Sequence, residues 1–554
     1  MCGLWIRTCA SYILAAVIVV MGGAAGAQSQ QPAPPPPHEG HDTVEASHQG
    51  HAAMMTGALG ITRARAGSGT SWLPDVTPVY AIHRNFGGWN TMLHENLFVQ
   101  YVNEGTDRGG DQLGSVNWGM AMAERRAAGG FLGLRTMFSL ERATVGECGY
   151  PDLFATGESC NGRPIHDRQH PHDLFMEAAG IYERELSATT ALQLYAGLAG
   201  EPALGPVAFP HRISALSTPI APLTHHWLDS THISYGVASA GVFGTRWKVE
   251  VSAFNGREPD ENRFDLDLDA LDSFSGRLWF APSDRWSVQI SKGHLKEAEV
   301  VAYGGLRRDV DRTTASATYH QLVGITGFWS VTGAWGRNAE DDHATDAVLV
   351  ETDLALDARN TLFARAEGAG KTGEELILPE LGHDPVTVAK LHLGYTRQLP
   401  GSGMFEPRVG GALSFSAIPD RAQQAYGRGS GFGILVFFSV RPGATFITPG
   451  ARASAAPRPE APVAADPHAG HVMPADPRQQ GAPSQQEPKP EAAAPQARTT
   501  PDNPAARLAD LTCEPQVDPD TAPRATYLGK AYYFCTAADR DLFLKAPGQS
   551  LQDR

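Results

Sequence analysis

The chain alternates apolar and polar residues with a period of two through many short segments between residues 89 and 442. In 246–254 the apolar set is Trp247, Val249, Val251 and Ala253, and the polar set is Lys248, Glu250 and Ser252. A period of two with one apolar face is typical of β-strands. We identify about sixteen such segments: 90–104, 113–127, 130–143, 172–187, 189–200, 231–244, 246–256, 271–282, 285–297, 312–323, 326–338, 345–357, 361–370, 386–399, 405–417 and 430–442.

The connections between these segments alternate in length. Short ones lie at 127–130, 244–245, 282–284, 357–360 and 400–403, and long ones at 144–171, 201–230, 257–270, 298–311, 371–385 and 418–429. Short turns alternating with long loops over an even number of strands are typical of outer-membrane β-barrels. The sequence therefore predicts an all-β fold, a transmembrane barrel of antiparallel strands over 89–442. The alternative is a soluble all-β protein with several sandwiches.

The first residues resemble an export signal. Arg7 precedes an apolar run over 13–21, and Ala25-Gly26-Ala27 forms a small-residue cleavage site. We therefore expect a signal peptide over 1–27; a single membrane anchor is the alternative, but the run is short for a spanning helix. With an even strand count, both ends of an outer-membrane barrel lie in the periplasm. We expect outer-membrane lipid as a partner and both tails in the periplasm.

Composition divides the rest of the chain. We expect a disordered His-rich arm over 28–88, a Pro/Ala-rich linker over 443–506 and a small separate domain over 507–554. The formal net charge is −15 and no basic stripe occurs, which argues against nucleic acid as a partner.

The unit His-x-Gly-His occurs three times in the tails. It pairs His38 with His41, His48 with His51, and His468 with His471; Met473 follows the third copy, and Met54 and Met55 follow the second. Imidazole suits copper, zinc and nickel, and thioether sulfur suits Cu(I). We interpret the units as metal ligands, with chance enrichment of a polar tail as the alternative. The segments resemble the His/Met-rich segments of bacterial outer-membrane copper-resistance proteins.

The C-terminal segment carries a longer pattern. Cys513 opens Cys-x-x-x-Val-Asp-Pro, and Tyr527 opens Tyr-x-Gly-x-x-Tyr-Tyr-Phe-Cys, which ends at Cys535. Over 513–547 the segment resembles a YHS domain, a small module often joined to heavy-metal transporters. The resemblance implies a metal site at Cys513 and Cys535. Asp539 stands where that family often has a further cysteine, so a mixed sulfur and oxygen site is one reading. A Cys513–Cys535 disulfide is the other.

The long loop 144–171 contains two features. Cys148 and Cys160 are predicted to form a disulfide, with a two-thiol metal site as the lesser alternative. His166, His170 and His172 follow within a short, polar stretch and are candidate metal ligands. The alternative, slightly favoured by the sequence, is a polar barrel rim. Four further histidines flank the next long loop and are expected nearby: His211, His225, His226 and His232.

The loop over 257–270 and its borders are acidic. The carboxylates are Glu258, Asp260, Glu261, Asp265, Asp267, Asp269 and Asp272. The pattern lacks the glycine and terminal glutamate of a calcium loop, so a solvated face that concentrates cations is expected.

Together these features predict an outer-membrane protein that handles heavy-metal ions, with copper favoured and zinc or nickel as alternatives. The expected mechanism is periplasmic binding by the arms and the YHS-like domain, coupled to a pore in the barrel. A passive porin-like channel with structural appendages is the second hypothesis. A barrel enzyme is the third; it requires a His/Ser/Asp set to converge at the outer rim. The motifs G-x-S-x-G, G-x-x-x-x-G-K-[ST] and H-E-x-x-H do not occur, and no catalytic residue is predicted.

Overall fold

The computed structural model describes residues 56–445, apart from 301–306, 325, 341–342, 383 and 402–403, together with parts of 523–540. The chain divides into two compact units, Met1–Ala451 and Arg452–Arg554. In the second unit, β22 (Arg524–Tyr527) and β23 (Lys530–Tyr533) form an antiparallel hairpin, followed by the buried side chain of Phe534.

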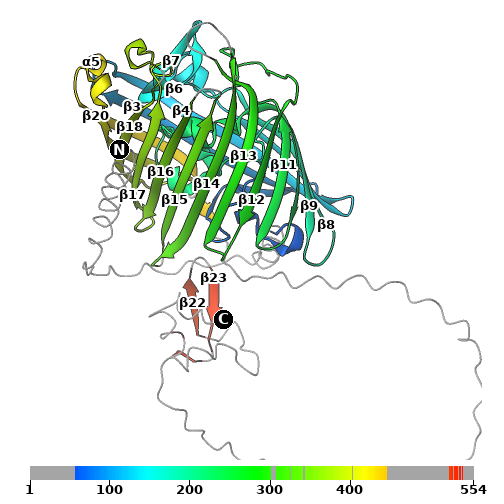
Figure 1. The fold of residues 1–554 in the computed structure, drawn as a ribbon. Coiled ribbons are helices and arrows are strands. Elements are labelled where there is room, and N and C mark those ends of the chain that lie inside the picture. Colours follow the sequence, from blue (N-terminus) through cyan, green and yellow to red (C-terminus); the bar gives the residue numbers. More distant parts are fainter. Residues whose placement is uncertain are drawn as a thin grey trace, which may run out of the picture. The chain divides into compact units, whose positions relative to one another are not determined.

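The first unit is a closed antiparallel barrel of sixteen strands (Figure 1). The strands are β3 (Trp89–Glu104), β4 (Gly110–Ala127), β5 (Gly130–Phe138), β8 (Phe175–Glu185), β9 (Ala191–Gly200), β10 (Ser234–Phe243), β11 (Trp247–Phe254), β12 (Ser273–Phe280), β13 (Trp286–Val300), β14 (Arg307–Val323), β15 (Gly327–Ala339), β16 (Ala344–Ala355), β17 (Asn360–Lys371), β18 (Val386–Gln398), β19 (Phe405–Ala417) and β20 (Ser430–Pro442). Each strand pairs with its neighbour in chain order, and β20 pairs with β3 to close the ring. Each predicted segment overlaps one of these strands, so the predicted sixteen-strand barrel is confirmed.

Two short pairings complete the wall at one end. β2 (Ile82–Phe86) pairs with the first half of β3, on the edge that β20 leaves unpaired. β1 (Val79–Tyr80) pairs with β21 (Ala444–Thr445). The chain therefore enters and leaves the barrel at the same place.

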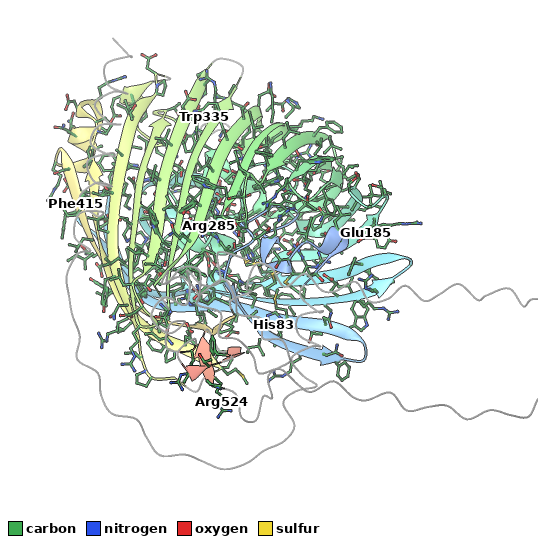
Figure 2. All side chains as sticks on the ribbon, turned by 90° about the horizontal axis from the view of Figure 1, so that it is seen from below. His83, Glu185, Arg285, Trp335, Phe415 and Arg524 are labelled. Carbon is green, nitrogen blue, oxygen red and sulfur yellow. A yellow bond between two sulfur atoms is a disulfide. The ribbon has the colours of Figure 1, made fainter. Side chains whose placement is uncertain are left out.

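The barrel wall has an apolar outside and a polar inside. On β11, Val249 and Val251 are exposed whereas Lys248 and Glu250 are buried, and Phe415 of β19 projects from the outer face (Figure 2). Trp286 and Tyr319 pack against each other on the outside near the short turns, with ring centroids 4.8 Å apart. An apolar band with aromatic residues at its border is the surface that a membrane-spanning barrel presents to lipid. The fold is that of an outer-membrane barrel. Among the described residues no helix is long and apolar enough to cross a membrane.

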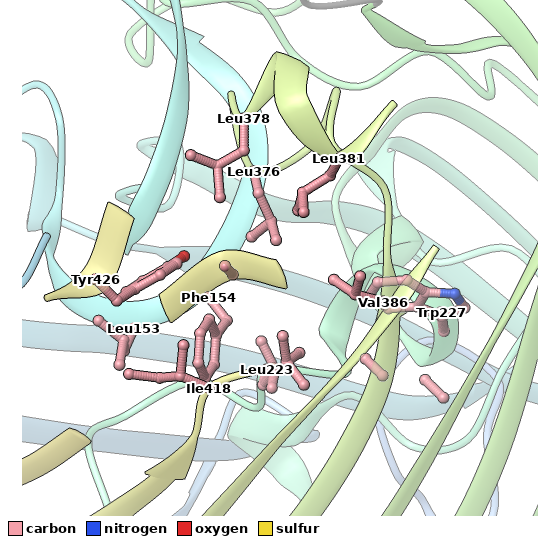
Figure 3. Packing of buried hydrophobic residues seen from close by; sticks show 14 of the residues in the cluster. Leu153, Phe154, Leu223, Trp227, Leu376, Leu378, Leu381, Val386, Ile418 and Tyr426 are labelled. Atoms are coloured by element: carbon pink, nitrogen blue, oxygen red, sulfur yellow. The ribbon is translucent and has the colours of Figure 1, made fainter. Parts of the chain in front are cut away.

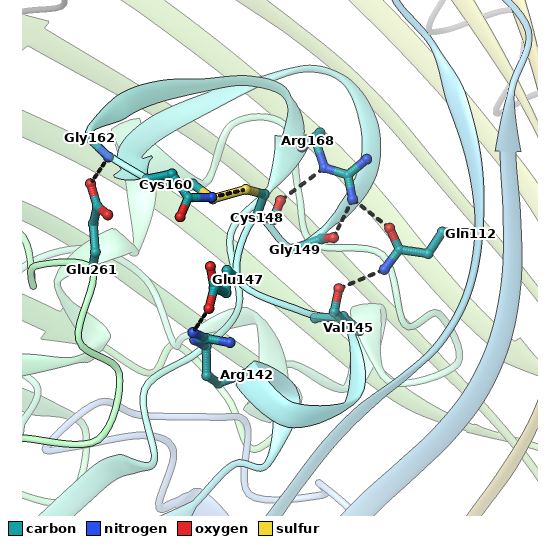
Figure 4. The surroundings of a disulfide bond; sticks show 11 residues. Gln112, Arg142, Val145, Glu147, Cys148, Gly149, Cys160, Gly162, Arg168 and Glu261 are labelled. Atoms are coloured by element: carbon teal, nitrogen blue, oxygen red, sulfur yellow. Dashed lines mark hydrogen bonds and ion pairs between the residues drawn. A yellow bond between two sulfur atoms is a disulfide. The ribbon is translucent and has the colours of Figure 1, made fainter.

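The long loops gather at the end of the barrel opposite to the short turns (Figure 1). The first contains α3 (Glu141–Thr144) and the hairpin of β6 (Tyr150–Cys160) and β7 (Arg163–Gln169). A disulfide joins Cys148 to Cys160, and Arg168 donates to the carbonyl oxygens of Cys148 and Gly149 (Figure 4).

These loops pack on one another through apolar side chains (Figure 3). Phe154 of β6 packs against Tyr426 of α5 (Gln423–Tyr426), with ring centroids 5.3 Å apart. Leu376, Leu381 and Trp227 join the same buried cluster from two other loops. The long loops therefore share one hydrophobic core at this end of the barrel.

The segment 201–233 folds down into the lumen. It contains η3 (Phe209–His211), η4 (Ile213–Ala215), α4 (His225–Leu228) and η5 (Ser230–His232). Its backbone accepts a hydrogen bond from Asn96 of β3 and donates one to Ser291 of β13, two strands that lie halfway round the barrel from each other. A segment that bonds to opposite walls must cross the lumen.

The lumen also contains residues 56–78. Ser287 donates to the carbonyl of Trp72, Thr77 bonds to His320, and Arg63 pairs with both Glu124 and Glu183. All of these partners are on the barrel wall. The prediction of a disordered arm over 28–88 is therefore wrong for residues 56–88. The composition of this stretch is poor in core residues, but a polar lumen supplies partners that an ordinary hydrophobic core does not.

Several predictions fall outside the described residues. These are the signal peptide 1–27, the histidines His38, His41, His48, His51, His468 and His471, Met473, most of the linker 443–506, and the YHS-like ligands Cys513, Cys535 and Asp539.

Deleting residues 56–78 is expected to open the half of the lumen next to the short turns. Because these residues occupy space that a sixteen-strand barrel otherwise leaves to water, single-channel conductance in planar bilayers should rise several-fold. Deletion of residues 28–50 is the matched control and should leave conductance unchanged. Equal conductance of the 56–78 deletion and the parent, with both proteins showing the heat-dependent gel shift of a folded barrel, would contradict the luminal placement.

Candidate functional site

The structure separates the three histidines predicted in the first long loop. His166 lies beside Arg108 and Asp167, with its Nδ1 2.6 Å from Nη2 of Arg108 and 3.0 Å from Oδ2 of Asp167. His170 and His172 instead enter a buried cavity at the long-loop end of the barrel. His170 and His172 thus lie in the same cavity, whereas His166 belongs to a polar network with Arg108 and Asp167.

Five imidazoles gather in this cavity. His170 and His172 come from the first long loop, and His225, His226 and His232 come from the segment 201–233. Ring centroids are 5.2 Å apart for His225 and His232, and 5.4 Å apart both for His172 and His232 and for His225 and His226. Two imidazoles bound to one tetrahedral ion at ~2.1 Å per nitrogen have centroids about 5 Å apart. Neighbouring rings are therefore close enough to share an ion. We call this set the histidine cluster.

A carboxylate or a carbonyl holds the Nδ1 side of three of these rings. His172 Nδ1 lies 2.9 Å from Glu141, His225 Nδ1 lies 2.8 Å from Asp229, and His232 Nδ1 donates to the backbone carbonyl of Asp229 over 2.8 Å. The Nε2 atoms of His172 and His232 are buried and lack a hydrogen-bond partner within the described part of the chain. Metal-binding histidines typically use one ring nitrogen for such a second contact and the other for the ion.

One imidazole and two carboxylates converge at the edge of the cluster. His226, Glu258 and Glu299 each offer a ligand atom, and these atoms all lie within 4.8 Å of one another. Among the described residues, His226 Nε2 is buried without a hydrogen-bond partner, whereas Glu258 Oε1 pairs with His226 Nδ1 at 2.8 Å and Glu299 Oε1 lies 3.9 Å from Arg312 Nη2. A buried imidazole nitrogen is rarely left unpaired, so its convergence with two carboxylates indicates a place for a cation. We call these three residues the rim triad.

A second cavity adjoins the rim triad and is strongly acidic. Glu158, Glu258 and Glu299 line it together with three further glutamates on its other side: Glu340, Glu374 and Glu375. Arg308 is the one arginine among its lining residues, and it pairs with Glu340 and Glu374. A cleft in which carboxyl groups outnumber guanidinium groups six to one raises the local concentration of counter-ions. Cations that enter this cavity meet the triad.

Burial keeps most of the histidine cluster neutral. It lowers the pKa of His225 to about 4, against the opposing effect of Asp229, and it lowers the pKa values of His170 and His232 well below their usual range. Burial also acts to lower the pKa of His172, but the Glu141 carboxylate outweighs it and the pKa is raised. Neutral imidazoles keep the nitrogen lone pairs that a metal ion needs.

The arrangement suits metal binding better than nucleophilic chemistry. Imidazole with carboxylate is the ligand set that proteins use for zinc, copper and nickel ions. Among the described residues, no hydrogen bond joins a serine hydroxyl to any imidazole of the histidine cluster. The side chains that converge at the rim are therefore histidines and carboxylates.

Sequence reasoning missed the carboxylates of this site. Glu258 was expected on a solvated acidic face, but its side chain turns inward to His226, whereas Asp260, Asp265 and Asp267 converge elsewhere in that loop. Glu299 lies beyond a register shift between Leu295 and Glu299 in the pairing of β13 with β14. Because 298–311 is predicted as a long loop, the sequence assigns no inward or outward face to Glu299, whereas β13 continues to Val300 in the structure.

Comparisons with known proteins bear on the barrel alone. No family model matches the chain, and no curated protein matches it. Similar solved structures include an anion-selective porin from Comamonas acidovorans, with 13% sequence identity and a TM-score of 0.40 over 64% of this chain and 99% of the porin. Another is a Salmonella typhi OmpF complex with daunomycin, with 9% identity and a TM-score of 0.40 over 65% and 100%.

A third structure is the in-vitro folded OmpT, an outer membrane protein of Vibrio cholerae, with 10% identity and a TM-score of 0.37 over 65% of this chain and 99% of that one. Sequence identities and TM-scores of this size carry no inference about what this chain binds or transports. The resemblances to YHS domains and to copper-resistance proteins remain predictions.

The carboxylate of Asp229 contacts three groups of the segment 201–233 that lie at the site. Its Oδ2 accepts from Arg212 over 2.6 Å and from the backbone N–H of Phe209 over 2.8 Å, and its Oδ1 faces His225. Asp229→Asn leaves Arg212 and Phe209 without a full acceptor in a buried place, which should lower the free energy of unfolding by about 3 kcal/mol. Thermal or urea unfolding in detergent measures this loss.

Asp346→Asn is the matched control for that variant. Asp346 pairs with Arg337 at 3.0 Å, but both side chains are 48% exposed. The control should lose less than about 1 kcal/mol. A similar small loss in Asp229→Asn would show that Asp229 does not hold the loop.

The metal-free protein should lose stability on acidification. The pKa of His225 is about 4 in the folded state, below the usual ~6.5 of the unfolded chain, so the unfolded state binds more protons between these values. The free energy of unfolding should therefore fall as the pH decreases from about 6.5 to about 4. His225→Gln should flatten that slope in chelator-treated samples unfolded by urea; an unchanged slope would contradict the assignment.

Proposed function

We propose that the protein handles transition-metal ions in the outer membrane, with copper favoured and zinc or nickel as alternatives. The observation that carries the proposal is the convergence of His226, Glu258 and Glu299 beside four further imidazoles. Neither a hydrophobic core nor a plain polar rim requires five histidines in one buried place. An acidic cavity outside the triad supplies the electrostatic attraction for a cation.

The tails extend the same function. The pairs His38 and His41, His48 and His51, and His468 and His471 offer imidazoles, and the predicted YHS-like site offers Cys513 and Cys535. Several weak sites tethered to one barrel hold an ion at high effective concentration, so ions exchange between them rather than diffuse away. In this mechanism the arms capture the ion and the barrel sites receive it or release it.

The orientation follows from the rule that short turns of such barrels face the periplasm. The pairing of β1 with β21 lies at the short-turn end, which supports the proposal that both tails are in the periplasm. The histidine cluster and the acidic cavity then lie toward the outside of the cell. In this proposal, ions reach the lumen from the periplasmic arms at one end and from the rim triad at the other.

A solute channel is the second candidate. The barrel has sixteen strands, a number at which porins enclose an aqueous pore. The segments 56–78 and 201–233 occupy the lumen, so a channel of this kind is narrow or opens only when one of them moves. On this view the histidines stabilise the loop and bind no ion.

The test is a zinc titration of the mature protein refolded in detergent, read by equilibrium dialysis and metal analysis. An arm variant carries His→Ala at residues 38, 41, 48, 51, 468 and 471 and Cys→Ser at 513 and 535. It should still bind about one ion per chain. Adding His226→Ala, Glu258→Gln and Glu299→Gln should remove that ion, because the rim triad is then lost.

His294→Ala in the arm variant is the control. His294 is 52% exposed and faces Asp311 on the outside of the barrel, so its removal should not change the stoichiometry. The proposal for the barrel fails if the arm variant binds no stoichiometric zinc, Cu(II) or Ni(II). It also fails if the rim-triad variant binds as much as its parent.

A further inference from the structure

A second set of metal-binding side chains lines the inner wall of the barrel at its short-turn end. In the pairing of β3 with β4, His94 lies opposite Met120 and Met92 lies opposite Met122. Directly opposed residues of antiparallel strands lie side by side on one face, with Cβ atoms ~5 Å apart. These four side chains line a cavity of about 150 Å³, together with His211 from η3.

Methionine is concentrated at this part of the wall. The described residues include six methionines, and five of them lie on β3, β4, β5 and β8: Met92, Met120, Met122, Met137 and Met176. Met137 is opposite Met120 on the next strand, and Met176 packs in the same cluster. Methionine fills irregular gaps in a core, but elsewhere among the described residues the buried apolar side chains are chiefly alanine, leucine, valine and phenylalanine. Thioethers grouped with imidazoles are the ligand set that proteins offer to Cu(I).

A hydrogen bond and ring packing fix the orientation of the two imidazoles, those of His94 and His211. His94 Nδ1 donates to the backbone carbonyl of Tyr80, which leaves the lone pair on Nε2. The ring of His211 lies nearly parallel to that of His94, at 16° with centroids 5.7 Å apart. Trp118 packs against both rings, at 4.8 Å and 5.3 Å. Packing and a second hydrogen bond fix ligand orientation as in metal sites of known function.

The charges around the cavity favour a monovalent ion. Arg63 lines it but is paired with Glu124 and Glu183, and Arg135 donates to the carbonyl of Gly69. Thioethers and neutral imidazoles bring no negative charge of their own. Glu124 also lines the cavity and, with Glu183, balances Arg63, so the neutral ligands here hold Cu(I) at a lower electrostatic cost than a divalent ion.

The position of η3 joins this cavity to the histidine cluster. The ring of Phe209 lies 5.3 Å from that of His225 and 5.7 Å from that of His172, and His211 is two residues further along the chain. One short turn thus separates the imidazole and carboxylate ligands of the outer end from the thioether and imidazole ligands of the inner end.

We infer that Met92, Met120 and Met122, with His94 and His211, form a luminal binding site for Cu(I). The inference goes beyond the proposed function, since it gives the barrel a soft-metal site whose ligands are separate from the rim triad. An ion that enters at the short-turn end would meet this site before the histidine cluster.

The test is an anaerobic Cu(I) titration against a chromophoric Cu(I) chelator such as bathocuproine disulfonate. The starting protein is the full mature chain with the arm variant's changes and with Met→Leu at 54, 55 and 473. It should bind one Cu(I) per chain at this site. Adding Met92→Leu, Met120→Leu and Met122→Leu should weaken that binding at least tenfold, because leucine keeps the volume but removes the sulfur.

Met404→Leu is the matched control and should bind Cu(I) like its parent. X-ray absorption at the copper edge of the starting protein gives a second readout that needs no further variant: sulfur and nitrogen neighbours are expected. The inference is overturned if the starting protein binds no Cu(I), if its copper has no sulfur neighbour, or if the triple Met→Leu variant binds as tightly as its parent.

The rim-triad variant separates this inference from the proposed function. His226→Ala with Glu258→Gln and Glu299→Gln should lose zinc and keep Cu(I), whereas the triple Met→Leu variant should lose Cu(I) and keep zinc. Loss of Cu(I) in the rim-triad variant would overturn a separate luminal site. Absence of zinc binding with retained, Met-dependent Cu(I) binding would instead remove the rim site alone.

Discussion

The pairing of β20 with β3 is the interaction on which the rest of the structure depends. Val440 is in register with Leu97 and Gly433 with Glu104, so the last strand of the sheet completes the backbone hydrogen bonds of the first. In lipid an open edge would leave unpaired N–H and C=O groups at several kcal/mol each, and only closure removes it. Closure of the barrel also determines which side chains face the lipid and which face the lumen. Every strand then presents its apolar set to lipid and its polar set to a lumen wide enough to need filling.

Buried charges determine how that lumen is filled. Arg212 bonds to Asp229 on its own segment and to Glu351 of β16, and Arg365 of β17 pairs with the other oxygen of Glu351. A buried ion pair adds little net stability, but removing one partner is costly, so such networks specify one arrangement. This network fixes the segment 201–233 against β16 and β17. Phe209 and His225 take their places because the same Asp229 carboxylate holds both.

The two ends of the lumen offer different ligand chemistry. At the long-loop end, imidazoles stand with glutamates beside an acidic cavity, a combination suited to divalent ions of intermediate softness. At the short-turn end, methionines stand with imidazoles and arginines, a combination suited to a soft monovalent ion. The sixteen-strand wall alone would suit an aqueous channel. The side chains that fill the lumen are what give a metal-handling function its support.

The sequence by itself determined the strands, because the period-two pattern is local. The residues of one strand alone define its apolar face and its polar face. It also drew attention to Cys148 and Cys160, whose short separation is a local property, and to His170 and His172. Only the tertiary structure decided that residues 56–78 lie in the lumen, that His225, His226 and His232 but not His211 join His170 and His172, and that Glu258 and Glu299 face them. Met92 and Met122 also become neighbours only through the register of β3 with β4. These contacts join residues far apart in the chain, and they exist because closure of the barrel makes a polar interior into which loops can fold.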